Sequence, residues 1–248
     1  MEGLARNRRR ILERVRASCE DAGRPVEDVT VVAVTKSVSA EAAAALFGLG
    51  CTSLGESRPQ ELERKAGWFE AHGLVPHWHF IGPLQRNKAR KVVRIADTIH
   101  SVDSARLFDT LERVALEEQR FPSLFLEVKL SDEPTKTGFS PDEVRSLLDE
   151  RPPGRLPILG LMGIAPRLEG APPEEIQRAA AETFERLASL AETLPRSRFQ
   201  PGGPRLSMGM SRDFELAIRA GADFVRIGSA FFEGVDLASM APSPESST

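Results

Sequence analysis

The chain has 248 residues, of which 41% are hydrophobic and 28% are charged, and its formal net charge is -3. This composition is ordinary for a globular protein, and the negative net charge argues against a nucleic-acid-binding protein, which usually carries a basic surplus. Cys19 and Cys51 are too few for a secreted disulfide framework. No apolar run approaches the roughly 18 residues of a membrane span. We therefore expect a cytoplasmic protein with no membrane or nucleic-acid partner.

The first twenty residues lack the uninterrupted apolar core of a signal peptide. Leu4, Ile11, Val15 and Cys19 fall near one face of a helix, so a packed N-terminal helix is expected. From Thr30 onward, short apolar runs alternate with stretches of helical spacing. The expected strands are Thr30–Val34, Cys51–Leu54, His77–Ile81, Thr98–Val102, Ser123–Val128, Leu156–Met162, Arg205–Met208 and Asp223–Ile227. Helices between them include Ala40–Leu49, Leu84–Ile95, Ala105–Glu118 and Glu174–Thr193.

Eight such alternations, with no strand-rich remainder, favour a single (β/α)₈ TIM-type barrel with an extra N-terminal helix over an open Rossmann sheet. No Gly/Ser linker or shift in composition divides the chain. We expect one barrel domain over residues 1–241 and a short disordered tail over residues 242–248, which is polar and rich in small residues.

The site of such a barrel forms at the carboxyl ends of its strands, and Lys36 is the first charge after the first strand. The chain has only six lysines. A lysine that leaves a low-dielectric strand end can present a neutral amine that attacks a carbonyl. The alternative is a strand-end lysine whose side chain simply reaches water.

A second feature lies after the seventh and eighth strands, whose loops commonly bind phosphate in these barrels. Ser207, Met208 and Ser211 lie at the first of these ends, and Arg226, Gly228 and Ser229 at the second. Hydroxyl groups and exposed backbone N–H groups at a helix start bind anions, and glycine allows close approach. The simpler alternative is that Ser211 and Ser229 only cap helices. A carbonyl-reactive lysine and a phosphate site on one rim suggest pyridoxal 5′-phosphate (PLP).

The histidines carry less information. Their spacing is not that of a metal site, and with two distant cysteines a zinc site is not expected. His79 could stand above a cofactor ring, or it could pack beneath a helix as an ordinary strand residue.

Taken together, the strand ends resemble the pyridoxal phosphate homeostasis proteins, which are similar to the N-terminal barrel of alanine racemase. The resemblance covers residues 30 to 234, nearly the whole barrel. The motifs that carry it are VAVTK ending at Lys36, Gly55-Glu56, HFIGPLQ from His79 with Asn87-Lys88, IHSVDS from Ile99, KTGF from Lys136, Gly160-Leu161-Met162, LSMGMS from Leu206 with Asp213, and VRIG from Val225.

The resemblance implies that Lys36 holds PLP as a Schiff base. It also implies phosphate contacts from Ser207 or Ser211 and from the backbone of Gly228 and Ser229, with Arg226 beside the pyridine nitrogen. Implied partners are PLP and PLP-dependent apoenzymes that receive it, and we expect a monomer or a weak dimer.

This sequence departs from the family pattern at three places. The family usually has Asn after Gly-Glu, where this chain has Ser57. An Asn usual after the fifth strand is Lys129 here, and Glu233 is an extra residue before Gly234. These departures put the surroundings of the ring in doubt rather than the binding of the cofactor.

Two functions compete: a non-catalytic protein that stores, buffers or delivers PLP, and a racemase-like enzyme. A two-base amino-acid racemase needs an acid/base group on each face of its substrate, and alanine racemase uses a tyrosine from a second domain for one of them. This chain has no tyrosine and ends after the expected barrel. We therefore expect no catalytic residues. A phosphosugar enzyme with a Schiff-base lysine would explain Lys36 but not Arg226.

Overall fold

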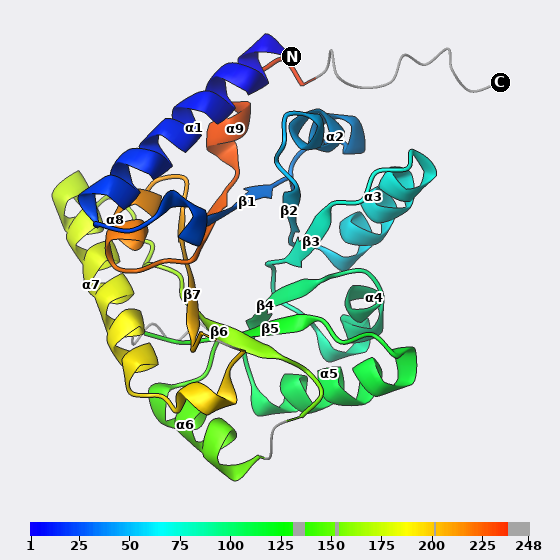
Figure 1. The fold of residues 1–248 in the computed structure, drawn as a ribbon, viewed down its shortest axis with the longest axis vertical. Helices are drawn as coiled ribbons and strands as arrows, with labels where there is room; N and C mark the ends of the chain where they lie inside the picture. Colours follow the sequence, from blue (N-terminus) through cyan, green and yellow to red (C-terminus); the bar gives the residue numbers. More distant parts are fainter. Residues whose placement is uncertain (131–136, 152–153, 201, 238–248) are drawn as a thin grey trace.

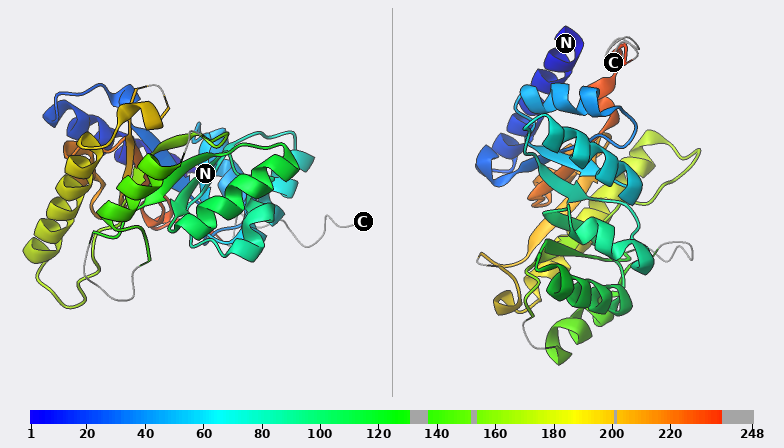
Figure 2. Two further views of the ribbon diagram at one scale, coloured as in Figure 1. Left: turned by 90° about the horizontal axis from the view of Figure 1, so that it is seen from below. Right: turned by 90° about the vertical axis from the view of Figure 1, so that its right-hand side faces the viewer.

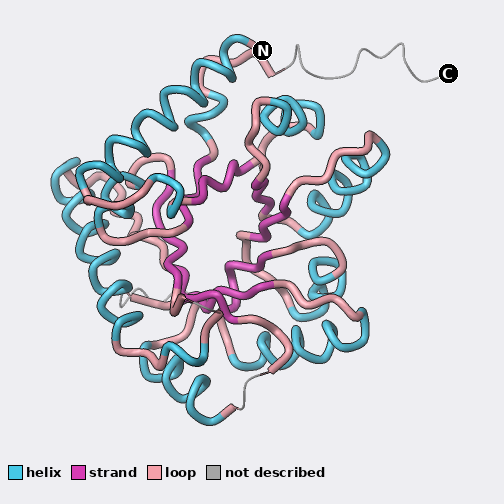
Figure 3. The backbone as a smooth tube through the Cα atoms, in the orientation of Figure 1, coloured by secondary structure: helices cyan, strands magenta, loops and turns pink. Residues whose placement is uncertain are grey.

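The computed structural model describes residues 1–130, 137–151, 154–200 and 202–237. Eight parallel strands close into a barrel in chain order, from β1 round to β8 and back to β1 (Figure 1). The strands form an inner ring and the helices lie outside it (Figure 3). The TIM-type barrel and the N-terminal helix expected from the sequence are both confirmed.

The strands are β1 Thr30–Val34, β2 Ser53–Glu56, β3 His77–Phe80, β4 Thr98–Val102, β5 Ser123–Glu127, β6 Ile158–Met162, β7 Arg205–Met210 and β8 Phe224–Ile227. The helices are α1 Glu2–Asp21, α2 Ala40–Gly48, α3 Pro59–Ala71, α4 Ala89–Val93, α5 Ala105–Glu118, α6 Pro141–Glu150, α7 Pro173–Glu192, α8 Phe214–Arg219 and α9 Ser229–Phe232. Three short 3₁₀ turns span Val26–Asp28, Arg86–Lys88 and Arg196–Arg198.

Most expected boundaries hold within two residues, and the two clearest differences have local causes. The second strand starts at Ser53 rather than Cys51, because the Cys51 N–H donates to the Leu46 carbonyl and closes the end of α2. The expected helix Leu84–Ile95 is divided: a 3₁₀ turn precedes α4, which ends at Val93.

Two apolar cores stabilise the barrel. The larger lies between the strands and the surrounding helices and includes Leu54, Leu111 and Phe184. The smaller fills the inside of the barrel with Val32, Phe125, Leu159, Met162 and Phe224. Side chains therefore fill the centre of the ring, as in other barrels of this type.

Helix α1 packs along the outside of the barrel beside α8 and α9, which come from the other end of the chain (Figures 1 and 2). Its buried face consists of Leu4, Asn7, Ile11, Val15, Ser18 and Cys19, which includes the four residues expected there. The Asn7 side chain donates to the carbonyls of Phe231 and Glu233 at 2.9 and 2.8 Å. These bonds hold α9, the helix that follows β8, in place.

The expected tail, residues 242–248, lies outside the described residues. In the part of the chain that is described, no helix combines the length and apolarity needed to cross a membrane.

Candidate cofactor site

Lys36 lies directly beyond the carboxyl end of β1, and its side chain is exposed. The residue before it, Thr35, is fully buried and donates its N–H to the Gly55 carbonyl of β2 at 2.9 Å. The Thr35 carbonyl accepts from the Val38 N–H at 3.1 Å. This bond closes a turn over Lys36 and Ser37, so the lysine projects from a fixed turn rather than from an open loop.

Strand β8 lies next to β1 and brings the residues that follow it close to this turn. In the register of the pair, Val32 lies opposite Arg226 and Ala33 opposite Ile227. A Cβ added at Gly228 would lie 3.3 Å from the Val34 Cβ, tighter than ordinary contact. Glycine therefore lets the chain after β8 pass close to the strand that carries Lys36.

The loop after β7 is tied to the start of α9 by Ser211. Its Oγ accepts from the Gly228 N–H at 3.1 Å. The alternative that Ser211 only caps its own following helix is wrong, because α8 begins at Phe214 with Asp213 at its N-cap. Ser229 is the exposed first residue of α9, with Gly228 at the N-cap. The two predicted phosphate-binding loops thus lie side by side.

Met208 is fully buried in the core between strands and helices, so its side chain faces away from the barrel interior. The next residue, Gly209, has a φ of 88°, and a Cβ there would lie 2.5 Å from the Ala217 Cβ. A side chain at position 209 would therefore disturb both the backbone and the packing of α8.

Arg226 is buried inside the barrel, with only 5% of its surface exposed. Its Nη1 donates to the Ser207 Oγ at 2.6 Å and its Nη2 donates to the Gly163 carbonyl at 3.0 Å. The Ser207 hydroxyl, which is also fully buried, is therefore engaged by the guanidinium. Because a guanidinium has five N–H groups, Arg226 retains donors for a further group.

Two buried histidines, His79 of β3 and His100 of β4, continue this arrangement across the barrel. Nδ1 of His100 hydrogen-bonds the Ser207 Oγ at 2.7 Å, and its Nε2 hydrogen-bonds Nδ1 of His79 at 2.9 Å. His79 lies among the interior side chains, so the alternative that it packs beneath a helix is wrong. Its Nε2 has no hydrogen-bond partner among the described residues.

Burial dominates the electrostatics of these groups. It lowers the pKa of His79 to about 3, with a further contribution from His77. Burial, and then the neighbouring His79 and Arg226, lower the pKa of His100 well below its ordinary value. Burial also lowers the pKa of Arg226 to about 10, although Glu127 and Asp213 oppose this. At neutral pH both histidines are therefore neutral and Arg226 carries the charge.

Sequence reasoning missed Glu127, which ends β5. Burial raises its pKa to about 7, the nearby Asp103 adds to the rise, and Arg226 opposes it. The signal was present in the sequence, because Glu127 is two residues after the interior Phe125 and therefore shares its face of the strand.

The structure shows which groups surround the three residues that depart from the family pattern. Ser57 follows β2 and abuts Gly82, where a Cβ would lie 2.1 Å from the Ser57 carbonyl oxygen. The Lys129 N–H donates to the Phe139 carbonyl at 2.8 Å. Glu233 pairs with Arg10 of α1 at 2.5 Å, so this residue contributes to the contact between α1 and the chain after α9.

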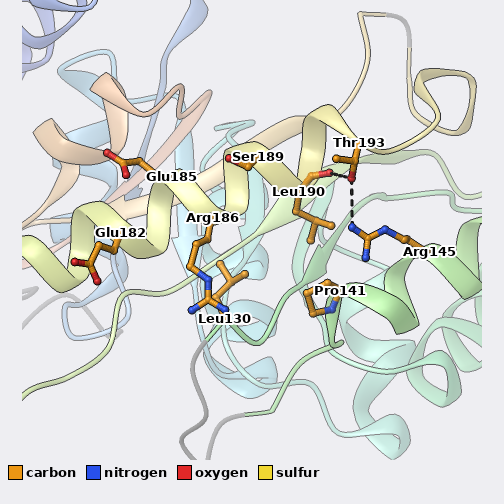
Figure 4. Close-up of a pocket in the computed structure, with 9 residues that line it drawn as sticks. All are labelled: Leu130, Pro141, Arg145, Glu182, Glu185, Arg186, Ser189, Leu190 and Thr193. Atoms are coloured by element: carbon orange, nitrogen blue, oxygen red, sulfur yellow. Dashed lines mark hydrogen bonds between the residues drawn. The ribbon is translucent and has the colours of Figure 1, made fainter.

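A surface depression of about 600 Å³ lies elsewhere, between α6 and α7 (Figure 4). Arg145 of α6 points toward α7 there and donates to the Thr193 hydroxyl at 3.5 Å. Lys36 and Arg226 do not line this depression. Within the described residues, no group of three or more His, Cys, Asp or Glu side chains could hold a metal ion.

The fold and the site define a (β/α)₈ barrel protein with an exposed lysine after β1, a buried guanidinium on β8 and two adjoining loops after β7 and β8. No protein-family model matches the sequence. The pyridoxal phosphate homeostasis protein of Aquifex aeolicus is 36% identical over 227 residues, which are 90% of this chain and 94% of that protein. This chain therefore belongs to the pyridoxal phosphate homeostasis protein family, as the motifs indicated.

Solved structures agree with this assignment. PipY of Synechococcus elongatus, solved without PLP and with PLP bound, is 36% identical, with TM-scores of 0.72 and 0.70 over 90% of this chain and 99% of the PipY chain. Alanine racemase of Bartonella henselae is 16% identical, with a TM-score of 0.64 over 98% of this chain and 61% of that enzyme. The expected similarity to the alanine racemase barrel is confirmed at the level of the fold.

The raised pKa of Glu127 predicts a pH-dependent stability. The ordinary value is 4.5 and the folded value is about 7, so between these values the folded protein holds a proton that the unfolded chain releases. The contribution of Glu127 to the free energy of unfolding therefore falls as pH rises through this window. In Glu127→Gln this fall should vanish, so the variant should gain stability relative to the wild type as pH rises.

Urea unfolding between about pH 5 and about pH 8 measures this difference directly. Glu174→Gln, which changes an exposed carboxylate at the start of α7, is the control and should follow the wild-type profile. A constant difference between Glu127→Gln and the wild type across the range would contradict the raised pKa.

Proposed function

We propose that this chain is a non-catalytic PLP-binding protein that stores, buffers or delivers the cofactor in the cytoplasm. One observation carries the proposal: β7, β8 and β1 are neighbours in the closed barrel. This order gathers Ser211, Arg226 and Lys36 at the carboxyl ends of three adjacent strands, where barrels of this type bind their ligands.

The residues present fit PLP. When bound, this group supplies an aldehyde that condenses reversibly with a primary amine, together with a ring that can accept electron density. Lys36 provides the amine on a turn whose backbone is fixed by hydrogen bonds. The spare N–H donors of Arg226 and the unpartnered Nε2 of His79 are buried polar groups of the kind that a bound polar ligand can satisfy.

The loops after β7 and β8 would hold the phosphate. Ser211 is half-buried and its hydroxyl already touches the Gly228 N–H. The N–H groups of Ser229 and Ala230 precede the first intrahelical bond of α9, which runs from Phe231 to Gly228. Because Ser207 is engaged by Arg226 and His100, we assign the phosphate contact to Ser211 and give Ser207 the role of orienting Arg226.

Arg226 would keep the pyridine nitrogen of bound PLP unprotonated. A guanidinium offers only donors, so it would meet the lone pair of that nitrogen. The neutral His79 and His100 add no second charge inside the barrel. Transaminases instead place a carboxylate beside this nitrogen, because protonation of the ring nitrogen makes the ring a strong electron sink.

The residue content of the chain favours a carrier over a racemase. The chain contains no tyrosine, so it cannot supply the second acid/base group in the way alanine racemase does. The partners of a carrier are PLP and the apoenzymes that receive it. We propose that the protein acts as a monomer or a weak dimer.

Covalent attachment should be confined to Lys36. Incubation with PLP, reduction with borohydride and peptide mapping should place a pyridoxyl group on Lys36, because its turn lies beside Arg226 and Ser211. Lys36→Ala should lose the visible absorbance of the attached cofactor while keeping the circular dichroism of the fold. A label found instead on Lys88, Lys129 or Lys136 would overturn the assignment.

The phosphate contact should depend on Ser211. A hydrogen bond to a charged group contributes about 1.5–3 kcal/mol, so Ser211→Ala should weaken PLP binding about tenfold or more. Binding of pyridoxal, which lacks the phosphate, should be weak and unaffected by the substitution, and this comparison is the internal control. Equal losses for PLP and pyridoxal would remove Ser211 from the phosphate site.

Racemase turnover should be absent. The protein loaded with PLP and incubated with L-alanine in deuterium oxide should exchange the α-proton no faster than free PLP at the same concentration. The physical reason is that the chain has no tyrosine to serve as the second acid/base group. Sustained exchange that disappears in Lys36→Ala would establish an enzyme.

A further inference from the structure

A fully buried ion pair lies directly behind the turn that carries Lys36. Glu56, the last residue of β2, and Lys65 of α3 both have side chains that are 0% exposed, and the Lys65 Nζ lies 2.5 Å from the Glu56 Oε1. The Thr35 Oγ1 donates to the same Glu56 oxygen at 2.6 Å. The three side chains form one fully buried polar cluster.

Lys65 also reaches the backbone of the turn. Its Nζ donates to the Thr35 carbonyl at 2.6 Å, the same carbonyl that accepts from the Val38 N–H at 3.1 Å. The first carbonyl of the Lys36 turn is therefore held by a buried ammonium, which is in turn held by Glu56. This chain of contacts links α3 and β2 to the residue immediately before Lys36.

The position of Lys65 is unusual for a packed helix. The buried residues of α3 are Leu62, Lys65 and Phe69, which follow helical spacing, so the pattern calls for an apolar residue at position 65. A buried ion pair loses much of its attraction to desolvation, and apolar residues of similar volume often replace one without loss of stability. The Glu56 Oε2 has no hydrogen-bond partner among the described residues, which adds to that cost. Packing alone therefore does not account for the pair.

We propose that Glu56 and Lys65 are positioning residues for Lys36: they fix the Thr35 carbonyl, and through it the turn that presents the lysine to the cofactor. The proposal rests on the proposed cofactor role of Lys36. It predicts that loss of the pair changes how the folded protein takes up PLP, even where stability is unchanged.

The decisive variant is the double substitution Glu56→Leu with Lys65→Met, which removes both charges and leaves no lone buried ion. Its urea unfolding midpoint should equal or exceed that of the wild type. Its rate of covalent PLP attachment and its affinity for PLP should nevertheless each fall by about tenfold or more, because small misplacements of a reacting group cost rates of this order.

A second measurement does not depend on the cofactor. In the protein without PLP, hydrogen exchange at the Val38 amide should speed up by about tenfold or more in the double variant, because its acceptor is no longer held and the turn opens more often. Amides in the middle of α5, on another side of the barrel, should keep their wild-type exchange rates.

The matched control lies on the same helix. Glu61 and Arg64 of α3 form an ion pair at 2.8 Å, and their side chains are 34% and 53% exposed. The double substitution Glu61→Gln with Arg64→Met removes two charges from α3 without touching the turn. It should leave PLP attachment, PLP affinity and Val38 exchange at wild-type values.

The outcomes separate this proposal from the proposed function. Wild-type attachment, affinity and Val38 exchange in the Glu56→Leu/Lys65→Met variant would overturn the positioning role. A double variant that failed to fold would also overturn it, since the pair would then be a requirement of the fold. If the wild type took up no PLP, the proposed function would fail, while Val38 exchange would still decide whether the pair holds the turn.

Discussion

The parallel pairing of β1 with β8 is the constraint on which the site depends. It closes the barrel and sets Val32 opposite Arg226, so the lysine near the start of the chain and the arginine near its end leave neighbouring strands. Helix α1 supports this closure from outside, because Asn7 holds the backbone at Phe231 and Glu233 beyond β8. Any change that shifted the register by one residue would turn Arg226 out of the barrel.

The interior then has to accommodate a charged guanidinium. Arg226 keeps its charge at neutral pH, because burial lowers its pKa only to about 10. Ser207 and Gly163 accept hydrogen bonds from it. The histidines that complete the arrangement are neutral. Each neutral imidazole has one donor and one acceptor nitrogen, so the proton position on His100 and that on His79 determine each other.

Much of the fold and several residues of the candidate site could be predicted from the sequence, because barrel strands are short, apolar and regularly spaced. The alternation of strands and helices predicts the fold. The positions of the strand ends predict that Lys36, Arg226 and Gly228 lie on one rim of the barrel, without knowledge of any contact. Contacts between distant elements could not be read in the same way. That Ser211 reaches Gly228 rather than its own helix, and that Ser207 faces Arg226, depends on the register of β7 with β8, which includes an irregularity between Ser207 and Met210.

Lys65 shows what a sequence pattern can and cannot reveal. A lysine at an apolar position of α3 is visible as an anomaly, but only the fold shows that its partners are Glu56 and the carbonyl before Lys36. The protein thus places Lys65 in the buried layer and Lys36 at the exposed rim. Lys36 is one residue beyond Thr35, whose carbonyl Lys65 holds. We propose that burial and exposure give the two lysines different tasks: the buried Lys65 stays paired and fixes the backbone, while the exposed Lys36 reacts with the cofactor. A carrier needs this division, because its reactive group must be accessible to PLP and yet return to the same place each time the cofactor leaves.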